Sequence, residues 1–322
     1  MTQVPEVSVI IPTYNREHTL KRAIESVLSQ TFKDFELIIV DDCSIDDTKD
    51  LVEGFRDERI VYVRHDRNVG PAGARNTGIK RARGQLIAFL DSDDEWFPEK
   101  LRLQVEFLKG APSFVEGVCT GYYLHLVRVG VTVEKIPGYP RSWLEEFLVR
   151  GCDLAPGTTF VGTARCFGRA GLFDEELPRL EDGDWLIRYA KHYQLGLIRK
   201  SMARVYSHER PRGEKVEASV LRFLKKHKGD LEQLGAYKRR KAEAKLHLQV
   251  AEAYLREKRF DKGLKWLARG IWANPFQRPG MYLLLWDATF GTSFGPRSSN
   301  LKWKVIGGLR GSHAGESGAE IR

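Results

Sequence analysis

The sequence reads Leu86-Ile87-Ala88-Phe89-Leu90-Asp91-Ser92-Asp93-Asp94 at the point that decides the fold. A short apolar run such as 86–90 is typical of a buried strand in a parallel sheet. The three carboxylates would then emerge at the carboxyl end of that strand, the edge at which open parallel sheets bind ligands. Carboxylates this close repel one another, and Mg²⁺ or Mn²⁺ would relieve the repulsion while also binding substrate phosphates. The alternative is a helix N-terminus, where Asp91 or Ser92 caps the helix and the following acids favour its dipole.

Upstream of this stretch, strand-like and helix-like segments alternate. Apolar runs at 7–11, 35–40 and 60–63 predict three further strands, and a helical pattern follows the first of them as far as Gln30. Polar residues follow the strands, most clearly Asp41 and Asp42. The pattern predicts an α/β domain with a mostly parallel mixed sheet flanked by helices, whose loops at one edge form the site.

A small-residue segment at 68–78 precedes the 86–90 strand. It contains no G-x-G-x-x-G after the first strand, so it does not match the dinucleotide-binding pattern. Gly70 permits close approach of the backbone to a ligand near a helix start, and Arg75 is available for a diphosphate. Ordinary packing of a helix on the sheet is the alternative.

Length and charge limit the possible classes of protein. The 322 residues, 42% of them hydrophobic, suffice for one large domain with an appendage. No run reaches the roughly 18 apolar residues of a membrane span, and no secretory signal is recognisable, so we expect a cytoplasmic protein. The net charge of +9 is uneven: residues 1–189 carry 24 Lys+Arg against 31 Asp+Glu, and residues 190–322 carry 28 against 12. The four cysteines show neither zinc-site nor disulfide spacing.

Four motifs occur in succession between residues 7 and 108. They are Pro12-Thr13-Tyr14-Asn15-Arg16, Asp41-Asp42 with Ser44 and Asp46, Asn68-x-Gly70 with Ala74-Arg75-Asn76-x-Gly78, and Leu90-Asp91-Ser92-Asp93-Asp94-x-Trp96-x-Pro98. Their order and spacing resemble those of family 2 inverting glycosyltransferases of GT-A fold. The resemblance continues more loosely through Gly171-x-Phe173-Asp174-Glu175 and Glu181-Asp182-x-Asp184-Trp185-x-x-Arg188, and so covers about two thirds of the chain. Cys43 stands where family members often have glycine.

The resemblance implies a GT-A nucleotide-diphospho-sugar transferase fold and assigns roles to individual residues. Tyr14 would stack on the nucleobase and Asp42 would accept a hydrogen bond from it. Asp91 and Asp93 resemble the DxD element that holds Mg²⁺ or Mn²⁺, with Asp93 the preferred direct ligand and His208 a further residue near the metal or diphosphate. The alternatives are a half-buried Tyr14, a loop-capping Asp42 and a surface His208. The residues expected to bind the nucleotide sugar are Pro12, Thr13, Tyr14, Asn15, Asp42, Asn68, Gly70, Arg75 and Asp91.

The acidic group Glu181-Asp182-Gly183-Asp184 comes where the family carries its catalytic base. Three acids within four residues favour a perturbed pKa, which suits a base that takes a proton from an acceptor hydroxyl. By motif position Asp182 is the first candidate and Asp184 the second. The alternative is that these acids merely open a helix expected at 185–192.

Beyond residue 213 the sequence becomes helical and basic. We expect residues 1–213 to form the catalytic domain, with a nucleotide-binding half at 1–108 and an acceptor half at 109–213, residues 214–310 a basic helical extension, and residues 311–322 a disordered tail. One tetratricopeptide-like helix pair fits the spacing of Ala244, Ala251, Tyr254, Gly263, Leu267, Gly270 and Pro275. Apolar residues 281–286 among basic ones suit a segment lying on an anionic membrane surface, at the inner face of the cell membrane; a plain core helix is the alternative.

The expected function is therefore a metal-dependent, inverting transfer of one sugar from a nucleotide-diphosphate donor to a hydroxyl of a glycan or a polyprenyl-linked acceptor. UDP is preferred as the nucleotide. No Q-x-x-R-W motif and no flanking membrane spans accompany the domain, which favours a non-processive enzyme. A sugar-nucleotide-binding protein without turnover and a basic nucleic-acid-binding protein are the alternatives. Nucleic acid is not an expected partner, because the basic part lacks any motif that reads bases.

Overall fold

The computed structural model describes residues 4–207 and 211–275, and the chain divides into two compact units, Met1–Glu209 and Arg210–Arg322. The boundary expected from the sequence lies between residues 213 and 214, and the assignment of a catalytic domain and a basic extension stays a prediction. His208, the 281–286 segment and the 311–322 tail lie outside the described residues.

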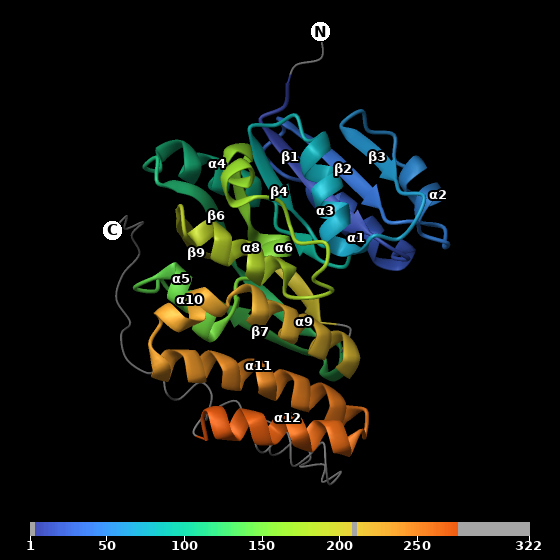
Figure 1. The fold of residues 1–322 in the computed structure, drawn as a ribbon. Helices are drawn as coiled ribbons and strands as arrows, with labels where there is room; N and C mark the ends of the chain where they lie inside the picture. The colour runs from blue at the N-terminus through green and yellow to red at the C-terminus, as the bar shows by residue number, and fades with distance from the viewer. Residues whose placement is uncertain (1–3, 208–210, 276–322) are drawn as a thin grey trace. The chain divides into compact units, whose positions relative to one another are not determined.

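The first unit is built on one mixed sheet (Figure 1). Its strands lie in the order β3-β2-β1-β4-β8-β6-β9-β5, with β7 paired to β6. The bounds of the strands are β1 Val7–Thr13, β2 Phe35–Asp41, β3 Ile60–Arg64, β4 Leu86–Phe89, β5 Glu95–Trp96, β6 Val115–Leu126, β7 Val131–Lys135, β8 Val161–Thr163 and β9 Gln194–Ser207.

The first four strands form the parallel part of the sheet. β1 pairs in parallel with both β2 and β4, and β2 pairs in parallel with β3. Every residue of β1, β2 and β4 is buried, which explains their predominantly apolar sequences. The two polar residues inside these strands, Ser8 and Glu36, are paired, since the Ser8 hydroxyl donates to Glu36 Oε1 at 2.6 Å. Beyond β4 the sheet is mixed, since β8 is antiparallel to both β4 and β6 whereas β9 is parallel to β6. The expected α/β fold with a mostly parallel mixed sheet is confirmed.

Helices connect these strands. They are α1 Glu17–Leu28, α2 Thr48–Glu53, α3 Gly70–Arg81, α4 Lys100–Gly110, α5 Trp143–Glu145, α6 Pro156–Thr159, α7 Ala164–Ala170 and α8 Glu181–Ala190, together with short helical turns η1 Val127–Val129 and η2 Glu146–Arg150. α3 packs closely on the sheet, because a Cβ at Gly78 would come within 2.4 Å of Ile10 Cγ2. α8 begins at Glu181, earlier than the helix expected at 185–192, so the three acids form its first turn.

The second unit is helical over its described part. Its helices are α9 Gly213–Lys226, α10 Lys228–Gln233, α11 Ala236–Arg256 and α12 Phe260–Ala273. α11 and α12 form an antiparallel pair whose close contact uses small residues: a Cβ at Gly263 would lie 2.6 Å from Leu255 Cδ2, and one at Gly270 would lie 2.7 Å from Leu248 Cγ. These are two of the positions at which the sequence predicted a helix pair.

Candidate active site

The parallel strands bring the sequence motifs to one edge of the sheet. Thr13 ends β1, Asp41 ends β2 and Phe89 ends β4, and all three strands run in the same direction. The Asp42 N–H donates to the Thr13 carbonyl at 2.8 Å, which joins the ends of β1 and β2 directly. Residues 13–16, 42–46 and 91–94 therefore share this edge, as the sequence predicted from the polarity of the strand ends.

Asp42 is buried and joins two of the motifs. One carboxylate oxygen accepts from the Val69 N–H (2.9 Å) and faces His65 Nδ1 (2.9 Å), and the other accepts from the Gly70 N–H (2.7 Å). The Asn68 side-chain amide donates to the Asp42 carbonyl at 3.2 Å. Asp42 thus fixes the turn into α3, where Gly70 has a φ of +86° that favours glycine. His65 completes this contact and was not singled out from the sequence.

The loop after β1 presents one aromatic ring. Tyr14 is 45% exposed, whereas Pro12 and Thr13 are buried in the strand. Asn15, at a φ of 50°, receives the Ile45 N–H on its side-chain oxygen (2.9 Å) and donates its own N–H to the Ser44 hydroxyl (2.9 Å). Asn15 therefore holds the loop in place and leaves the Tyr14 ring open to a flat ligand.

The carboxylates after β4 differ in exposure. The side chains of Asp91 and Asp93 are 37% and 20% exposed, whereas Asp94 is buried. Asp91 accepts from Arg75 Nη2 at 2.6 Å, and Asp93 lies 3.8 Å from Arg16 Nη2. Asp91 and Asp93 are thus open to a ligand at this edge, and the alternative of a simple helix cap does not apply, since α4 begins only at Lys100.

Asp94 connects this loop to two distant segments. Its carboxylate accepts from the Thr158 hydroxyl and from the Tyr206 N–H (2.8 Å). Burial, together with the charges of Asp91 and Asp93, raises the pKa of Asp94 well above its ordinary value. Sequence reasoning missed Thr158, because its partner is 64 residues away and a Gly-Thr-Thr turn carries no local signal for it.

Arg75 joins the two acidic segments. Its buried guanidinium donates to Asp91 through Nη2 (2.6 Å) and to Glu181 through Nη1 (3.0 Å). Burial by itself would lower the pKa of Arg75, but the charges of Asp91 and Glu181 raise it above its ordinary value, so the guanidinium stays charged. Burial and the neighbouring Asp182 raise the pKa of Glu181, while Arg75 opposes that shift. Arg75 Nε is buried and has no hydrogen-bond partner among the described residues.

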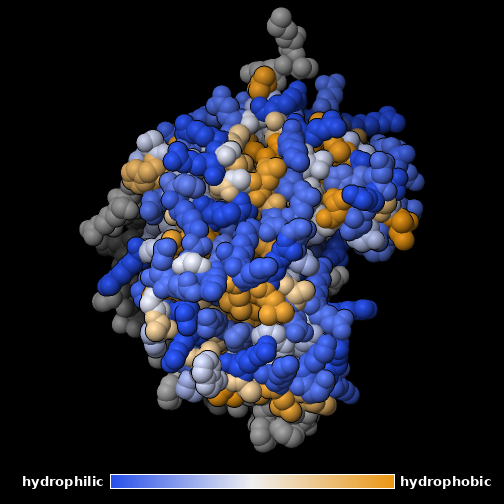
Figure 2. All heavy atoms as spheres, viewed as in Figure 1, coloured by the Kyte–Doolittle hydropathy of each residue, from blue (hydrophilic) through white to orange (hydrophobic). Residues whose placement is uncertain are grey.

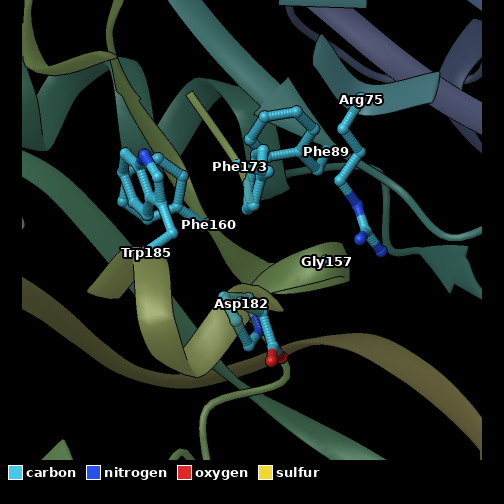
Figure 3. Close-up of a pocket in the computed structure, with 8 residues that line it drawn as sticks. Arg75, Phe89, Gly157, Phe160, Phe173, Asp182 and Trp185 are labelled. Carbon is cyan, nitrogen blue, oxygen red and sulfur yellow. The ribbon is translucent and has the colours of Figure 1, made fainter. Parts of the chain in front are cut away.

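A pocket lies beside Arg75 (Figure 3). The Arg75 guanidinium lies beside Gly157, and the Asp182 carboxylate points away from the aromatic rings (Figure 3). A Cβ at residue 157 would come within 2.6 Å of Asp91 Oδ2, so a larger residue here would displace the Asp91 carboxylate. The apolar residues that line the pocket are Phe89, Pro156, Phe160, Phe173 and Trp185.

Asp182 and Asp184 occupy different environments. Asp182 lines the pocket, and its carboxylate accepts from the Gly183 N–H at 2.7 Å. Asp184 is fully buried, and Arg188 donates to it through Nη2 (2.8 Å) and Nε (3.0 Å). The geometry therefore favours Asp182 over Asp184 as a group that meets a substrate.

The carboxylates of Asp91 and Asp93 are suitable ligands for a hard divalent cation, and substrate oxygens would fill the remaining positions of its coordination shell. Mg²⁺ in phosphate-handling sites takes one or two carboxylates from the protein, and Asp91 and Asp93 could supply them. Within residues 4–207 and 211–275 there is no cluster of three or more His, Cys, Asp or Glu side chains that could hold a metal by itself. His208, predicted to lie near the metal, is outside these ranges.

Comparison with known proteins gives related sequences. The sequence model of "Glycosyl transferase family 2" matches residues 8–153. An uncharacterized glycosyltransferase of Rickettsia felis is 36% identical over 201 residues, which is 62% of this chain but only 33% of that protein. The UDP-Glc:alpha-D-GlcNAc-diphosphoundecaprenol beta-1,3-glucosyltransferase WfaP of Escherichia coli is 33% identical over 181 residues, 56% of this chain and 68% of that protein. The chain thus spans about a third of the Rickettsia relative and about two thirds of WfaP.

A solved structure shares the fold. The mannosyltransferase PcManGT of Pyrobaculum calidifontis, solved with GDP-Man and Mn²⁺, aligns with a TM-score of 0.56 at 20% identity. The alignment covers 96% of this chain and 87% of that one. At this identity the likeness concerns the fold alone.

Proposed function

The chain belongs to family 2 of the glycosyltransferases, with a GT-A fold, and from this we propose that it moves one sugar from a nucleotide-diphosphate donor to a hydroxyl group. The observation that carries the proposal is the position of Arg75. Its guanidinium touches both Asp91, next to the diphosphate and metal position, and Glu181, next to Asp182. The donor diphosphate and the acceptor hydroxyl would therefore meet in one pocket.

The nucleotide would bind across the carboxyl edge of β1 and β2. Tyr14 offers an exposed ring for stacking on the base. The Asp42 carboxylate has three protein partners: Val69 and His65 contact Oδ1, and the Gly70 N–H donates to Oδ2. Oδ2 therefore retains a lone pair for a base N–H. Pro12, Thr13, Asn15, Asn68 and Gly70 shape this position through backbone and loop contacts. UDP is the preferred nucleotide, and the sugar is not specified by these residues.

Asp91 and Asp93 would hold a divalent cation, Mg²⁺ or Mn²⁺. Bound there with the diphosphate, the cation would neutralise the charge that develops on the leaving group. Arg75 keeps Asp91 in place through the hydrogen bond from its Nη2. His208 is proposed to lie near this position.

Asp182 would act as the base. It would accept the proton of the acceptor hydroxyl while the acceptor oxygen forms a bond to the anomeric carbon and the bond from that carbon to the diphosphate breaks. This single displacement inverts the configuration of the anomeric carbon. The Arg75–Glu181 pair lies beside the pocket and holds the first turn of α8, which carries Asp182.

The acceptor is proposed to be a glycan or a polyprenyl-linked saccharide of the cell envelope. Support comes from WfaP, whose name specifies a diphosphoundecaprenol-linked acceptor. Among the described residues, no helix has the length and apolarity needed to cross a membrane. We further propose a non-processive enzyme located in the cytoplasm, peripheral to the inner face of the cell membrane, with its basic C-terminal part as the contact.

Substitution of Asp93 tests the metal assignment. Asp93→Ala removes one of the two exposed carboxylates of the loop while its main-chain carbonyl keeps the contact with Arg22 Nη2 (2.5 Å). We expect transfer of radiolabelled sugar from UDP-sugars with Mn²⁺ to fall by at least about 10²-fold, with an unchanged melting temperature. Isothermal titration with UDP and Mn²⁺ then separates lost metal binding from lost turnover. Full transfer by Asp93→Ala would remove the metal role of this residue, and a product of retained configuration would contradict the inverting step.

A further inference from the structure

Helix α12 is apolar on two sides. Its first side, formed by Gly263, Trp266, Gly270 and Ala273, is buried. Its second side carries exposed apolar residues: Phe260 is 38%, Leu264 is 52% and Ile271 is 39% exposed. Together with the half-buried Leu267 these residues follow the i, i+4, i+7, i+11 spacing of one helix face. We refer to Phe260, Leu264, Leu267 and Ile271 as the α12 stripe.

The exposed apolar residues of the second unit concentrate on this helix. Within residues 211–275 six large apolar side chains are exposed, and four of them, including Trp272 at 80%, belong to α12. Figure 2 shows apolar side chains gathered over α12 at the lower edge of the view. A soluble helix normally carries a single apolar face, so a second contiguous one indicates a second partner.

Basic residues occupy another exposed side of α12, next to Trp272. Lys265 and Arg269 form an exposed i, i+4 row on the same helix. At the end of α12, the Arg240 guanidinium of α11 lies 5.9 Å from the centre of the Trp272 ring. Tyr237, at the start of α11, is 73% exposed. Apolar residues flanked by Lys and Arg, with Trp and Tyr at the margin, match the composition of helices that lie in a lipid headgroup layer.

We propose that the α12 stripe is the surface by which the enzyme binds an anionic lipid layer. The inference deepens the membrane contact of the proposed function and rests on it, and it places that contact on α12 rather than on residues 281–286. Residues 211–275 carry 17 Lys+Arg against 8 Asp+Glu, which suits an anionic headgroup layer.

Charge also argues against the nearest alternative occupant, the following part of this chain. Residues 276–310 contain five Lys+Arg and one Asp. The five cations of that segment would be repelled by the basic second unit, whereas anionic lipid would attract that unit. The uncharged apolar residues 281–286 are exempt from this repulsion, so their packing on the stripe is one of the outcomes that the test distinguishes. A second copy of the chain remains as an outcome of the test.

The test uses the full chain and vesicles of phosphatidylglycerol and phosphatidylcholine in equal parts. The stripe variant is Leu264→Ser with Ile271→Ser, and its matched control is Leu221→Ser, because Leu221 is 49% exposed on α9 and lies outside the stripe. A charge variant, Lys265→Glu with Arg269→Glu, is matched by Lys225→Glu. Binding is measured by vesicle sedimentation at low and high salt.

We expect the wild-type chain to sediment with these vesicles at low salt and to be released at high salt. The stripe variant should bind about ten-fold or more weakly, the charge variant should lose its salt dependence along with most of its binding, and both controls should bind as the wild type does. All variants should bind UDP and Mn²⁺ equally well by titration, so a failed membrane contact is distinguishable from a failed catalytic proposal.

Two results would overturn the inference. The first is that the wild-type chain does not bind the anionic vesicles at low salt. The second is that the stripe variant binds vesicles normally but melts at a lower temperature, or changes its sedimentation coefficient, which would mean that residues 276–322 or a second copy covers the stripe.

Discussion

At the scale of single residues, Arg75 determines how the site is assembled. Asp91 and Glu181 are separated by 90 residues of sequence, yet one buried guanidinium donates to both. Asn76, the next residue, likewise donates to the Phe173 carbonyl (3.0 Å) and to Glu175 (2.8 Å). Two consecutive side chains of α3 thus fix the segment that leads to Asp182, which explains why an Ala-Arg-Asn run accompanies the acidic motifs.

The different environments of Asp182 and Asp184 predict opposite effects of the same substitution. Asp182→Asn should lower kcat about 10²- to 10⁴-fold and leave the melting temperature unchanged, because the side chain lines the pocket and is not part of the core. Asp184→Asn should lower the free energy of unfolding by about 2–3 kcal/mol, because it leaves the Arg188 guanidinium without its buried carboxylate. Transfer kinetics and thermal unfolding of both variants check this. A stable, inactive Asp184→Asn with a normal Asp182→Asn would reverse the assignment.

Lys100 predicts a pH dependence of stability. Its side chain is fully buried, donates to Gln104 Oε1 at 2.6 Å and lies 3.9 Å from the centre of the Trp96 ring. Burial lowers the pKa of Lys100 well below its ordinary value. Between the lowered and the ordinary pKa, the unfolded chain binds one more proton than the folded chain, so stability rises with pH by up to about 1.4 kcal/mol per pH unit. Lys100→Met should remove this rise.

Urea unfolding of the wild type and Lys100→Met at several pH values above neutrality measures the difference. The lost hydrogen bond to Gln104 costs about 1 kcal/mol at every pH, so it shifts the curve without changing its slope. Equal slopes of stability against pH for the two proteins would contradict the lowered pKa of Lys100.

At the scale of elements, α6 supports the acidic loop. Within this four-residue helix Gly157 lies against Asp91, and the Thr158 hydroxyl donates to Asp94. The Thr158 carbonyl also accepts from Trp96 Nε1 at 2.7 Å, so a single turn contacts both ends of the 91–96 segment. The orientation of Asp91 and Asp93 therefore depends on an element 60 residues further along the chain.

Thr158→Val is expected to weaken the apparent affinity for Mn²⁺ about ten-fold, because Asp94 loses the donor that fixes the loop carrying the two metal-facing carboxylates. The matched control is Thr159→Val, since the Thr159 hydroxyl donates to the Leu154 carbonyl (2.6 Å) and has no contact with Asp94. Both variants should lose similar stability, and only the first should need more Mn²⁺ in the transfer assay. Equal metal requirements would show that α6 has only a packing role.

How well the sequence predicts an element depends on how far away in the sequence its contact partners lie. Strands β1, β2 and β4 were predictable, because a buried parallel strand is mostly apolar and polar residues follow it. The region 115–163 was not, since β8 has three residues and its pairing partners lie far away in sequence. The candidate site divides in the same way: Asp91 and Asp182 stand in motifs, whereas Thr158 and His65 act through partners that no local pattern reveals.

At the scale of the whole molecule, the proposed sugar transfer and the proposed membrane contact belong to different units. The described residues assigned to nucleotide, metal and base all belong to the first unit, and the α12 stripe belongs to the second. Free Cys119 and Cys166 are buried in the first unit, and burial raises the pKa of Cys119 to about 12. The uneven charge of the sequence matches this division.

Ligand binding should therefore stabilise one unit only. UDP with Mn²⁺ at about 100 times the dissociation constant should add about 2.7 kcal/mol to the free energy of unfolding of the first unit. Hydrogen exchange of the full chain is expected to slow at residues 13–16, 68–75 and 91–94 and to stay unchanged in α11 and α12. Slower exchange in α11 and α12 upon ligand addition would contradict the expectation that the ligand stabilises only the first unit.

The strand order has a consequence for synthesis of the protein. β4 pairs with β1 on one side, but its other neighbour, β8, is encoded about 70 residues later. At a translation rate of roughly 5–20 residues per second, the open edge of β4 waits about 4–14 s on the ribosome before β8 emerges. During that interval the nascent chain offers an apolar strand edge to its neighbours, so we expect its yield to depend on chaperones that bind emerging chains and to fall when translation stalls between codons 90 and 160.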